Sequence, residues 1–323
     1  MTNMTNLAII DLGSNSVRLK INQLADSGQV KLLRYEKEYV RLSEDMGPEK
    51  LLKTAPIERT VAQLARFMDI CQTIPNVQLI TTATAAVRQA VNRAEFIDRV
   101  KREVGLDIHV ISGEHEAYLD YLGVSRTLPL KNGLILDTGG ASMELILVDD
   151  GYAEEAISLP MGSVLLSQRY HLGGHIAPEN LYDAIIHVDE VLAGQRWLNR
   201  ARHMRVVALG GSNRALAKMY RWQQLADGGN VPPVHGLTMS TTDAFALMHQ
   251  LIATDKEGRA AIRGISTARA DVIVGGLLPV MALLRQLHMK QLMFSSNGLR
   301  EGLLFQYQAG EVNPEMIQRL DFA

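Results

Sequence analysis

One short segment occurs twice in this chain, and the repetition limits the folds that the chain can adopt. Residues 9–19 read IIDLGSNSVRL and residues 135–145 read ILDTGGASMEL, and the two copies align without gaps at an offset of 126 residues. Each copy predicts a strand that ends in aspartate, a tight turn that contains glycine and serine, and a returning strand. We therefore expect two duplicated domains that face one another.

The rest of the chain alternates short apolar runs with helical patterns, which is typical of α/β architecture with mixed sheets. We expect strands at 7–11, 17–23, 30–40, 77–82, 108–111, 206–209 and 292–295. Helices are expected at 57–74, 93–104, 178–199, 240–253 and 271–287, and an exposed loop at 226–233.

The composition is that of a globular protein without a strong overall charge. A chain of 323 residues, 47% of them hydrophobic, is long enough for two domains. Its 33 Lys and Arg nearly balance 35 Asp and Glu, so no global field attracts nucleic acid or an anionic membrane. No basic leader or membrane-spanning apolar run is seen, so we expect a cytoplasmic protein. Cys71, the single cysteine, follows a helical apolar pattern and is expected to be buried.

The two repeated turns carry groups that suit a phosphate. The first turn contains Gly13, Ser14 and Asn15, and the second contains Gly139, Gly140 and Ser142. Glycine lets backbone N–H groups converge on a phosphate, because no Cβ blocks the approach and a positive φ costs little. One such turn alone is equally typical of an ordinary hairpin. Two copies in register favour a pair of phosphate-binding loops.

Carboxylates stand at the ends of the repeated strands. Asp11 and Asp137 each close a predicted strand, and Glu144 lies on the second returning strand. Mg²⁺ prefers oxygen ligands and usually keeps several waters. We therefore expect these three residues to hold Mg²⁺, which would bridge phosphate oxygens and stabilise the charge of a phosphoryl-transfer transition state.

A hydrolase also needs a base to orient water, and an acidic segment offers candidates. Residues 112–124 read SGEHEAYLDYLGV and include Glu114, Glu116 and Asp120. The same composition is typical of a helix start, because carboxylates in the first turn interact favourably with the helix dipole. The residues alone leave both interpretations open.

Taken together, these segments resemble the exopolyphosphatase and guanosine pentaphosphate phosphohydrolase (Ppx/GppA) family, and the resemblance spans nearly the whole chain. Further matching segments are YVRLSEDMG and PIERT within residues 39–60, ATAAVRQAVNRAEF at 83–96, SLPMGSVLLSQRY at 158–170, RADVIVGGLLP at 269–279 and GLREGLL at 298–304.

The resemblance implies the fold. It predicts two ribonuclease H-like α/β domains with an interdomain cleft, as in actin, sugar kinases and heat-shock chaperone ATPases. We place the first domain at residues 1–123 and the second at 124–311, with a C-terminal helix at 312–323 that returns to the first domain. Larger relatives append a C-terminal helical domain, and this chain resembles a short form without one.

The resemblance also implies roles for individual residues. Glu116 matches the family's general base, whereas Glu114 matches no required position. Arg88 resembles the family's phosphate-binding arginine, whose planar guanidinium suits phosphate oxygens. A third phosphate loop is implied at Gly210, Gly211 and Ser212. The second and third loops depart from the family pattern at Ala141, Met143, Asn213 and Arg214.

The implied activity is release of terminal orthophosphate from inorganic polyphosphate by Mg²⁺-assisted attack of water. One alternative is removal of the 5′ phosphate from guanosine pentaphosphate, with the same catalytic groups. The altered loops favour a second alternative, a sensor that binds polyphosphate or an alarmone with little turnover. A kinase is a further possibility on fold alone. The expected partner is polyphosphate or a phosphate-rich nucleotide, not nucleic acid or a membrane, and homodimer formation is left open.

Overall fold

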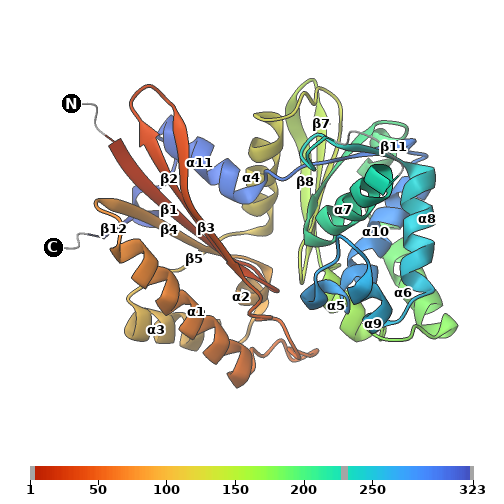
Figure 1. The fold of residues 1–323 in the computed structure, drawn as a ribbon, viewed down its shortest axis with the longest axis horizontal. Helices are drawn as coiled ribbons and strands as arrows, with labels where there is room; N and C mark the ends of the chain where they lie inside the picture. The colour runs from red at the N-terminus through yellow and green to blue at the C-terminus, as the bar shows by residue number, and fades with distance from the viewer. Residues whose placement is uncertain (1–3, 227–231, 321–323) are drawn as a thin grey trace. The chain divides into compact units, whose positions relative to one another are not determined.

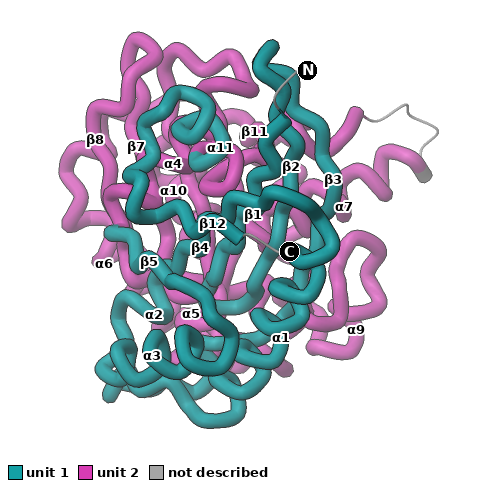
Figure 2. The backbone as a smooth tube through the Cα atoms, turned by 90° about the vertical axis from the view of Figure 1, so that its left-hand side faces the viewer, with its two compact units in different colours: residues 1–112, 303–323 teal, residues 113–302 magenta. Residues whose placement is uncertain are grey.

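The computed structural model describes residues 4–226 and 232–320. The chain forms two compact units, which Figure 2 shows in different colours. Unit 1 comprises Met1–Ser112 and Leu303–Ala323, and unit 2 comprises Gly113–Gly302. Each unit is built on a six-stranded sheet, and both sheets are mixed.

The sheet of unit 1 has the strand order β12-β4-β1-β2-β3, and β5 also pairs with β4. Its strands are β1 (Met4–Leu12), β2 (Val17–Ala25), β3 (Val30–Glu38), β4 (Val77–Ala83), β5 (His109–Val110) and β12 (Gln318–Leu320). Its helices are α1 (Thr54–Gln72), α2 (Ala85–Gln89), α3 (Arg93–Val104) and the 3-10 helix η3 (Pro314–Met316). Helix α11 (Leu299–Ala309) begins in unit 2 and ends in unit 1.

The sheet of unit 2 has the strand order β10-β11-β9-β6-β7-β8. Its strands are β6 (Gly133–Thr138), β7 (Met143–Asp149), β8 (Tyr152–Leu159), β9 (Arg205–Gly210), β10 (Thr238–Ser240) and β11 (Gln291–Phe294). Its helices are α4 (Gly113–Ser125), α5 (Ser163–Arg169), α6 (Pro178–Ala193), α7 (Gly211–Ala226), α8 (Thr241–Ile252), α9 (Lys256–Ala261) and α10 (Ile273–Gln286), with 3-10 helices η1 (Arg196–Ala201) and η2 (Thr267–Arg269).

The structure confirms the repeated hairpin. In unit 1, β1 is antiparallel to β2 and parallel to β4, and in unit 2, β6 is antiparallel to β7 and parallel to β9. Each turn is closed by an equivalent hydrogen bond. The N–H of Gly13 donates to Ser16 O at 3.1 Å, and the N–H of Gly139 donates to Ser142 O at 3.0 Å. The two loops are therefore local copies of the same structure.

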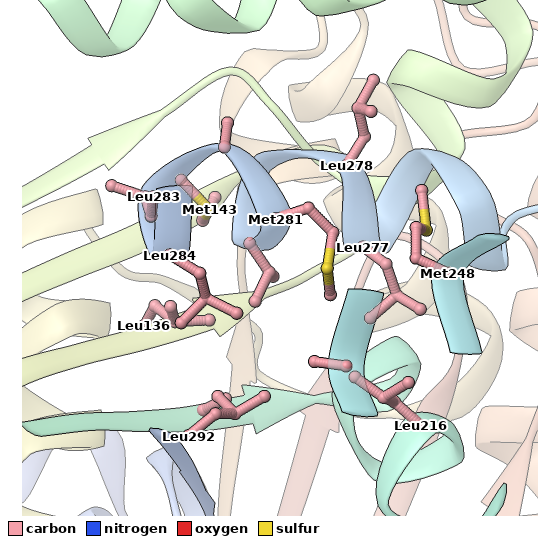
Figure 3. Close-up of a cluster of buried hydrophobic side chains, with 14 of the residues drawn as sticks. Leu136, Met143, Leu216, Met248, Leu277, Leu278, Met281, Leu283, Leu284 and Leu292 are labelled. Atoms are coloured by element: carbon pink, nitrogen blue, oxygen red, sulfur yellow. The ribbon is translucent and has the colours of Figure 1, made fainter. Parts of the chain in front are cut away.

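Both faces of the unit 2 sheet are covered. Side chains alternate along a strand, so Leu134 and Leu136 of β6 pack into the large cluster around α10, whereas Ile135 packs toward α4 with Ala117 and Val124. Figure 3 shows the α10 cluster, with side chains from α7, α8 and β11 gathered around that helix. Burial on both faces fixes the register of the strands, because a slip by one residue would exchange the two apolar surfaces.

In unit 1, helices α1 and α3 lie beside each other along one face of the sheet (Figure 1). Helix α1 buries Leu64, Phe67 and Cys71 in the core of this unit. This confirms the expected burial of Cys71, and burial raises the pKa of its thiol to about 12. Helix α3 covers the predicted range 93–104, and Gly105 caps its end with a φ of 77° that favours glycine.

Two predictions of domain organisation are wrong in detail. The division falls after Ser112 rather than at residue 123, because α4 packs against the unit 2 strands β6, β7 and β8. The expected C-terminal helix is a short 3-10 turn followed by β12, which pairs antiparallel with β4. A strand is favoured there because it pairs backbone groups of β4 that would otherwise be left open.

The expected loop at 226–233 falls largely outside the described residues. None of the helices within residues 4–226 and 232–320 combines the length and apolar character that a membrane crossing requires.

Candidate functional site

Four carboxylates of unit 2 gather on one face of its sheet, near the end of β6. Asp137 and Glu144 are directly opposite partners on β6 and β7. Both lie on the face that α4 covers, because residues two apart on a strand share a face. Glu116 and Asp120 lie one helical turn apart on α4. The fold therefore brings together two of the three predicted metal ligands and the predicted base.

Asp120 is a member of this group to which the sequence analysis assigned no definite role. Its side chain is buried, and burial raises the pKa of its carboxyl group well above the usual range. The negative charges of Asp137, Glu144 and Glu116 raise this pKa further. The one sequence signal was its spacing of four residues from Glu116, which places both carboxylates on one face of a helix.

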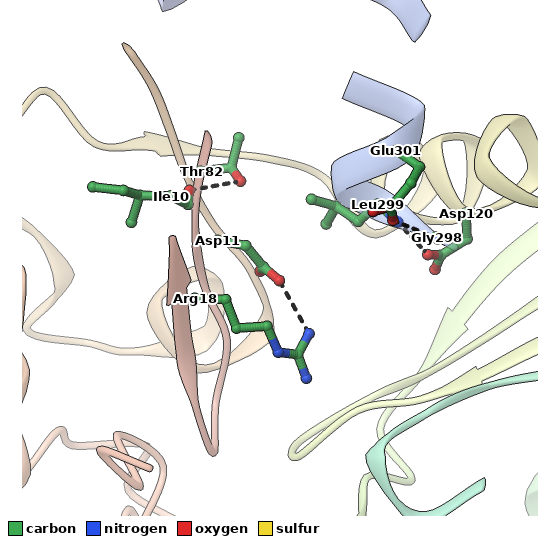
Figure 4. A network of polar contacts seen from close by, with 8 residues as sticks. All are labelled: Ile10, Asp11, Arg18, Thr82, Asp120, Gly298, Leu299 and Glu301. Carbon is green, nitrogen blue, oxygen red and sulfur yellow. Dashed lines mark hydrogen bonds and ion pairs between the residues drawn. The ribbon is translucent and has the colours of Figure 1, made fainter. Parts of the chain in front are cut away.

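Asp120 also anchors the start of α11. Its Oδ1 accepts a hydrogen bond from the N–H of Leu299 at 2.8 Å (Figure 4). The N–H of Gly298 donates to Glu301 Oε2 at 3.0 Å, so two carboxylates receive the first N–H groups of this helix. A Cβ on Gly298 would lie 2.6 Å from Asp120 Oδ1. The helix start and α4 are therefore packed without spare room.

Glu144 and Glu116 occupy different environments within the group. Glu144 is buried, and its Oε1 accepts a hydrogen bond from Ser158 Oγ of β8 at 2.7 Å. Glu116 is half-buried, and its charge is felt at Asp120. Glu114, by contrast, is exposed. Glu116 and Glu114 thus differ in burial, and the role of Glu116 as the base stays a prediction.

The second loop is fixed from behind by the start of α5. The backbone N–H and Oγ of Ser163 donate to Gly139 O at 2.9 and 3.0 Å, and the N–H of Val164 donates to Gly140 O at 2.8 Å. Neither Gly13 nor Gly139 has a positive φ. Freedom to adopt a positive φ is therefore not used at these two positions. Glycine matters here for a different reason. A Cβ on Gly13 would lie 3.1 Å from Ser16 O, and a Cβ on Gly139 would lie 3.1 Å from Ser142 O.

The predicted third loop is the direct junction between β9, which ends at Gly210, and α7, which begins at Gly211, and it lies against the end of β6. Gly210 has a φ of 92°, and a Cβ there would lie 2.4 Å from Thr138 O and 2.6 Å from Asp137 Oδ1. Glycine is therefore needed at this position, and it allows the loop to approach the carboxylate group.

Buried side chains organise the first turn of α7, which contains the predicted loop residues Gly211 and Ser212. The Nη1 of Arg269 donates to Ser212 Oγ at 3.3 Å, and a Cβ on Gly211 would meet the Arg269 guanidinium. Asn213 is fully buried, and its Nδ2 donates to Leu209 O at 2.6 Å and to Thr138 Oγ1 at 3.2 Å. The residue that departs from the family pattern here thus ties β9 to β6. Sequence reasoning missed both Arg269 and this role of Asn213.

The first loop lies in unit 1 and is held by a neighbouring segment. Ser14 and Asn15 are buried, and their carbonyl oxygens accept the N–H groups of Ser43 and Arg41 at 2.9 and 3.0 Å. The Nδ2 of Asn15 is buried without a hydrogen-bond partner in the described structure. An unsatisfied buried donor of this kind is compatible with an anion ligand.

Two predicted site residues of unit 1, Asp11 and Arg88, each contact another group of the same unit. Asp11 and Arg18 are opposite partners on β1 and β2, and they form an ion pair at 3.2 Å (Figure 4). Arg88 lies on α2, half-buried, and its Nη1 donates to Ile111 O at 3.0 Å. Roles for Asp11 and Arg88 in binding metal and phosphate stay predictions.

The chemistry of the unit 2 group fits Mg²⁺. All four side chains offer oxygen ligands, and Asp120 Oδ2 is buried without a hydrogen-bond partner in the described structure. Across residues 4–226 and 232–320, no three His, Cys, Asp or Glu side chains form a ready metal cage. Mg²⁺ rarely needs one, since it is usually held by one or two carboxylates with water and substrate phosphates.

Comparison with known proteins places this architecture in one family. The model of the Ppx/GppA phosphatase family matches residues 21–309. A Haemophilus influenzae protein named "Putative exopolyphosphatase" is 29% identical over 308 residues, which cover 94% of this chain and 91% of that protein.

Solved structures agree. An exopolyphosphatase from Cytophaga hutchinsonii is 26% identical, with a TM-score of 0.85 over 95% of this chain and 98% of that one. The Aquifex aeolicus member of the Ppx/GppA family is 28% identical, with a TM-score of 0.74 over 96% of this chain and 100% of that one. The chain belongs to the Ppx/GppA phosphatase family.

Proposed function

We propose that this protein is an exopolyphosphatase, which releases terminal orthophosphate from inorganic polyphosphate by attack of water. The observation that carries the proposal is the gathering of Glu116, Asp120, Asp137 and Glu144 on one face of the unit 2 sheet, beside the second and third loops. Family membership and the relatives' names support the substrate class.

Glu116 acts as the general base. It is half-buried, and its negative charge acts on buried Asp120. It accepts a proton from water while the water oxygen bonds to the terminal phosphorus. The anhydride P–O bond then breaks, and orthophosphate leaves the shortened chain without a covalent enzyme intermediate.

Asp137 and Glu144 are proposed to hold Mg²⁺, with Ser158 orienting the Glu144 carboxylate through its hydroxyl. The bound cation would supply positive charge to the phosphate oxygens. Gly139, Gly140 and Ser142 of the second loop are proposed to hold a phosphate through backbone N–H groups and the serine hydroxyl. In unit 1, Asp11 is proposed to bind the metal ion, and Arg88 is proposed to bind phosphate, as the family resemblance implies.

A substrate panel tests the proposal. Purified protein with Mg²⁺ is given short polyphosphate, long polyphosphate, guanosine pentaphosphate and ATP, and released orthophosphate is measured. We expect the highest kcat/KM on polyphosphate. A preference for guanosine pentaphosphate would reassign the substrate, and binding without phosphate release from any of the four would favour a sensor.

A further inference from the structure

Unit 2 has a cavity at the opposite end of its sheet from the carboxylates. Strands β6, β9 and β11 are parallel neighbours, so their first residues share one edge of the sheet. A cavity of about 670 Å³ lies at this edge, lined by residues 129–132, 203–205 and 290–291. At about 3.3 Å per residue, the length of β6 separates it from Asp137 by roughly 15 Å.

The cavity is lined by basic side chains and by no acidic one. The basic residues are Lys131, His203, Arg205 and Lys290, and all four are exposed. Lys131 pairs with exposed Asp150 at 2.9 Å, and an exposed pair of this kind contributes little stability. Within the described ranges, Arg205 and Lys290 have no carboxylate partner. The cavity therefore presents a local positive field in a chain that is nearly neutral overall.

Three of these residues form a row. Lys290 immediately precedes β11, Arg205 begins β9, and Lys131 stands two residues before β6. These strands are consecutive in the sheet, in the order β11-β9-β6. Neighbouring strands lie about 4.8 Å apart, so the three backbone positions span roughly 10 Å. A row of this length suits a linear anion better than a single phosphate group.

The backbone that carries the row is fixed by hydrogen bonds. The N–H of His203 donates to Leu287 O at 2.8 Å, and the imidazoles of His203 and His288 stack at 5.5 Å. The N–H of Thr241 donates to Lys290 O at 3.0 Å. The basic residues are thus attached to an ordered frame, which reduces the entropy that ligand binding would cost.

We propose that this cavity, with its basic lining, is a second anion site. It binds a linear phosphate chain at a distance from the four carboxylates of unit 2. Its lining contains no Phe, Tyr or Trp on which a nucleic acid base could stack, so a bare phosphate chain is favoured over an oligonucleotide. The choice of phosphate over another linear anion rests on the proposed function. The presence of an anion site does not.

The test measures ligand protection at individual lysines. The intact protein, in EDTA so that Mg²⁺-dependent hydrolysis is suppressed, is acetylated with and without inorganic tripolyphosphate, and each lysine is followed by peptide mass spectrometry. We expect tripolyphosphate to slow the labelling of Lys131 and Lys290 but not of Lys218 and Lys256, which are exposed lysines of unit 2 outside the pocket.

A variant tests whether binding in the pocket causes the protection of these lysines. Arg205→Gln should raise the tripolyphosphate concentration for half-protection by about tenfold, since a charge-assisted contact is lost. Lys218→Gln, which removes one positive charge elsewhere in unit 2, should leave it unchanged. A retained circular dichroism spectrum and melting temperature would establish that Arg205→Gln is folded.

Specific outcomes would overturn the proposal. Equal labelling of Lys131 and Lys290 with and without tripolyphosphate would contradict the anion site. An unchanged tripolyphosphate concentration for half-protection in Arg205→Gln would contradict it too. Equal protection by polyaspartate at the same charge concentration would remove the assignment to a phosphate chain. Protection without any hydrolysis in the substrate panel would support the pocket while contradicting the proposed activity.

Discussion

Asp137 and Glu144 face each other as directly paired residues on β6 and β7, so two carboxylates stand where the equivalent strands of unit 1 place an acid against a base. Like charges directly opposite on antiparallel strands are destabilising. The arrangement in unit 1 is balanced internally by the Asp11–Arg18 ion pair. In unit 2, a bound cation would offset the repulsion between Asp137 and Glu144. The first prediction follows from this contrast.

Removal of divalent cations should abolish hydrolysis. Phosphate release is measured before and after extensive treatment with EDTA, and again after Mg²⁺ is restored. Without a cation the carboxylates repel the phosphates they are proposed to process. We expect loss of activity and its recovery with Mg²⁺. Full activity in thoroughly chelated protein would contradict both the metal assignment and the mechanism.

Glu116→Gln should lower kcat by about 10²–10⁴-fold, the usual contribution of a general base, while substrate binding is retained. Gln preserves size and hydrogen bonding but does not accept a proton from water. The matched control is Glu114→Gln, two residues earlier and exposed, which should have a much smaller effect. Equal activities of the two variants, or a selective loss in Glu114→Gln, would remove Glu116 as the base.

Asp120 should make stability depend on pH. Because the folded state raises the pKa of this carboxyl group, the folded state favours its protonated form. Its contribution to stability is complete below the unfolded-state pKa of about 4 and is lost as pH rises through the folded-state pKa. Asp120→Asn does not ionise, and it keeps an acceptor for the Leu299 N–H.

The free energy of unfolding, measured with urea in EDTA from pH 4 to 8, should therefore rise in Asp120→Asn relative to wild type as pH increases. The expected gain is about 1.4 kcal/mol for each unit by which folding raises the pKa. Asp98→Asn, at an exposed position of α3, is the control and should show no such trend. A difference that stays constant across this range would mean that Asp120 folds in its ionised form.

Gly210→Ala should destabilise the protein and impair hydrolysis together. A Cβ at this φ of 92° would meet Thr138 O and Asp137 Oδ1. We expect a loss of about 1–3 kcal/mol in unfolding free energy, with lower kcat because Asp137 is displaced. Gly174→Ala is the control, since a Cβ added there would meet no atom within 4 Å. Wild-type stability and activity in Gly210→Ala would show that the backbone around Gly210 accommodates a Cβ without loss of stability.

Cys71 should be unreactive in the folded protein. Burial raises the pKa of its thiol to about 12, and reaction requires the thiolate. Treatment with a thiol-specific disulfide reagent at neutral pH should label almost no cysteine until denaturant is added, and then one per chain. Rapid stoichiometric labelling of the native protein would contradict the structural role of this residue.

The amino-acid sequence determined the local elements. The repeated hairpins could be predicted because alternating apolar residues and turn-forming residues act over a few positions. The end of α3 at Gly105 follows from a single glycine, and the start of α8 from the capping hydroxyl of Ser240, whose Oγ accepts the Asp243 N–H at 3.1 Å. Asp137, Glu144 and Glu116 were candidates for the same reason, since their positions relative to these elements are local.

Only the tertiary structure decided which surfaces those elements cover. Helix α4 belongs to unit 2 because its apolar face packs on the sheet there, and no pattern within 113–125 specifies that partner. The role of Asp120 depends on Leu299, 179 residues away, and that of Asn213 on Thr138, 75 residues away. Local propensity extends over a few residues, whereas burial and charge interactions depend on which distant segments pack together.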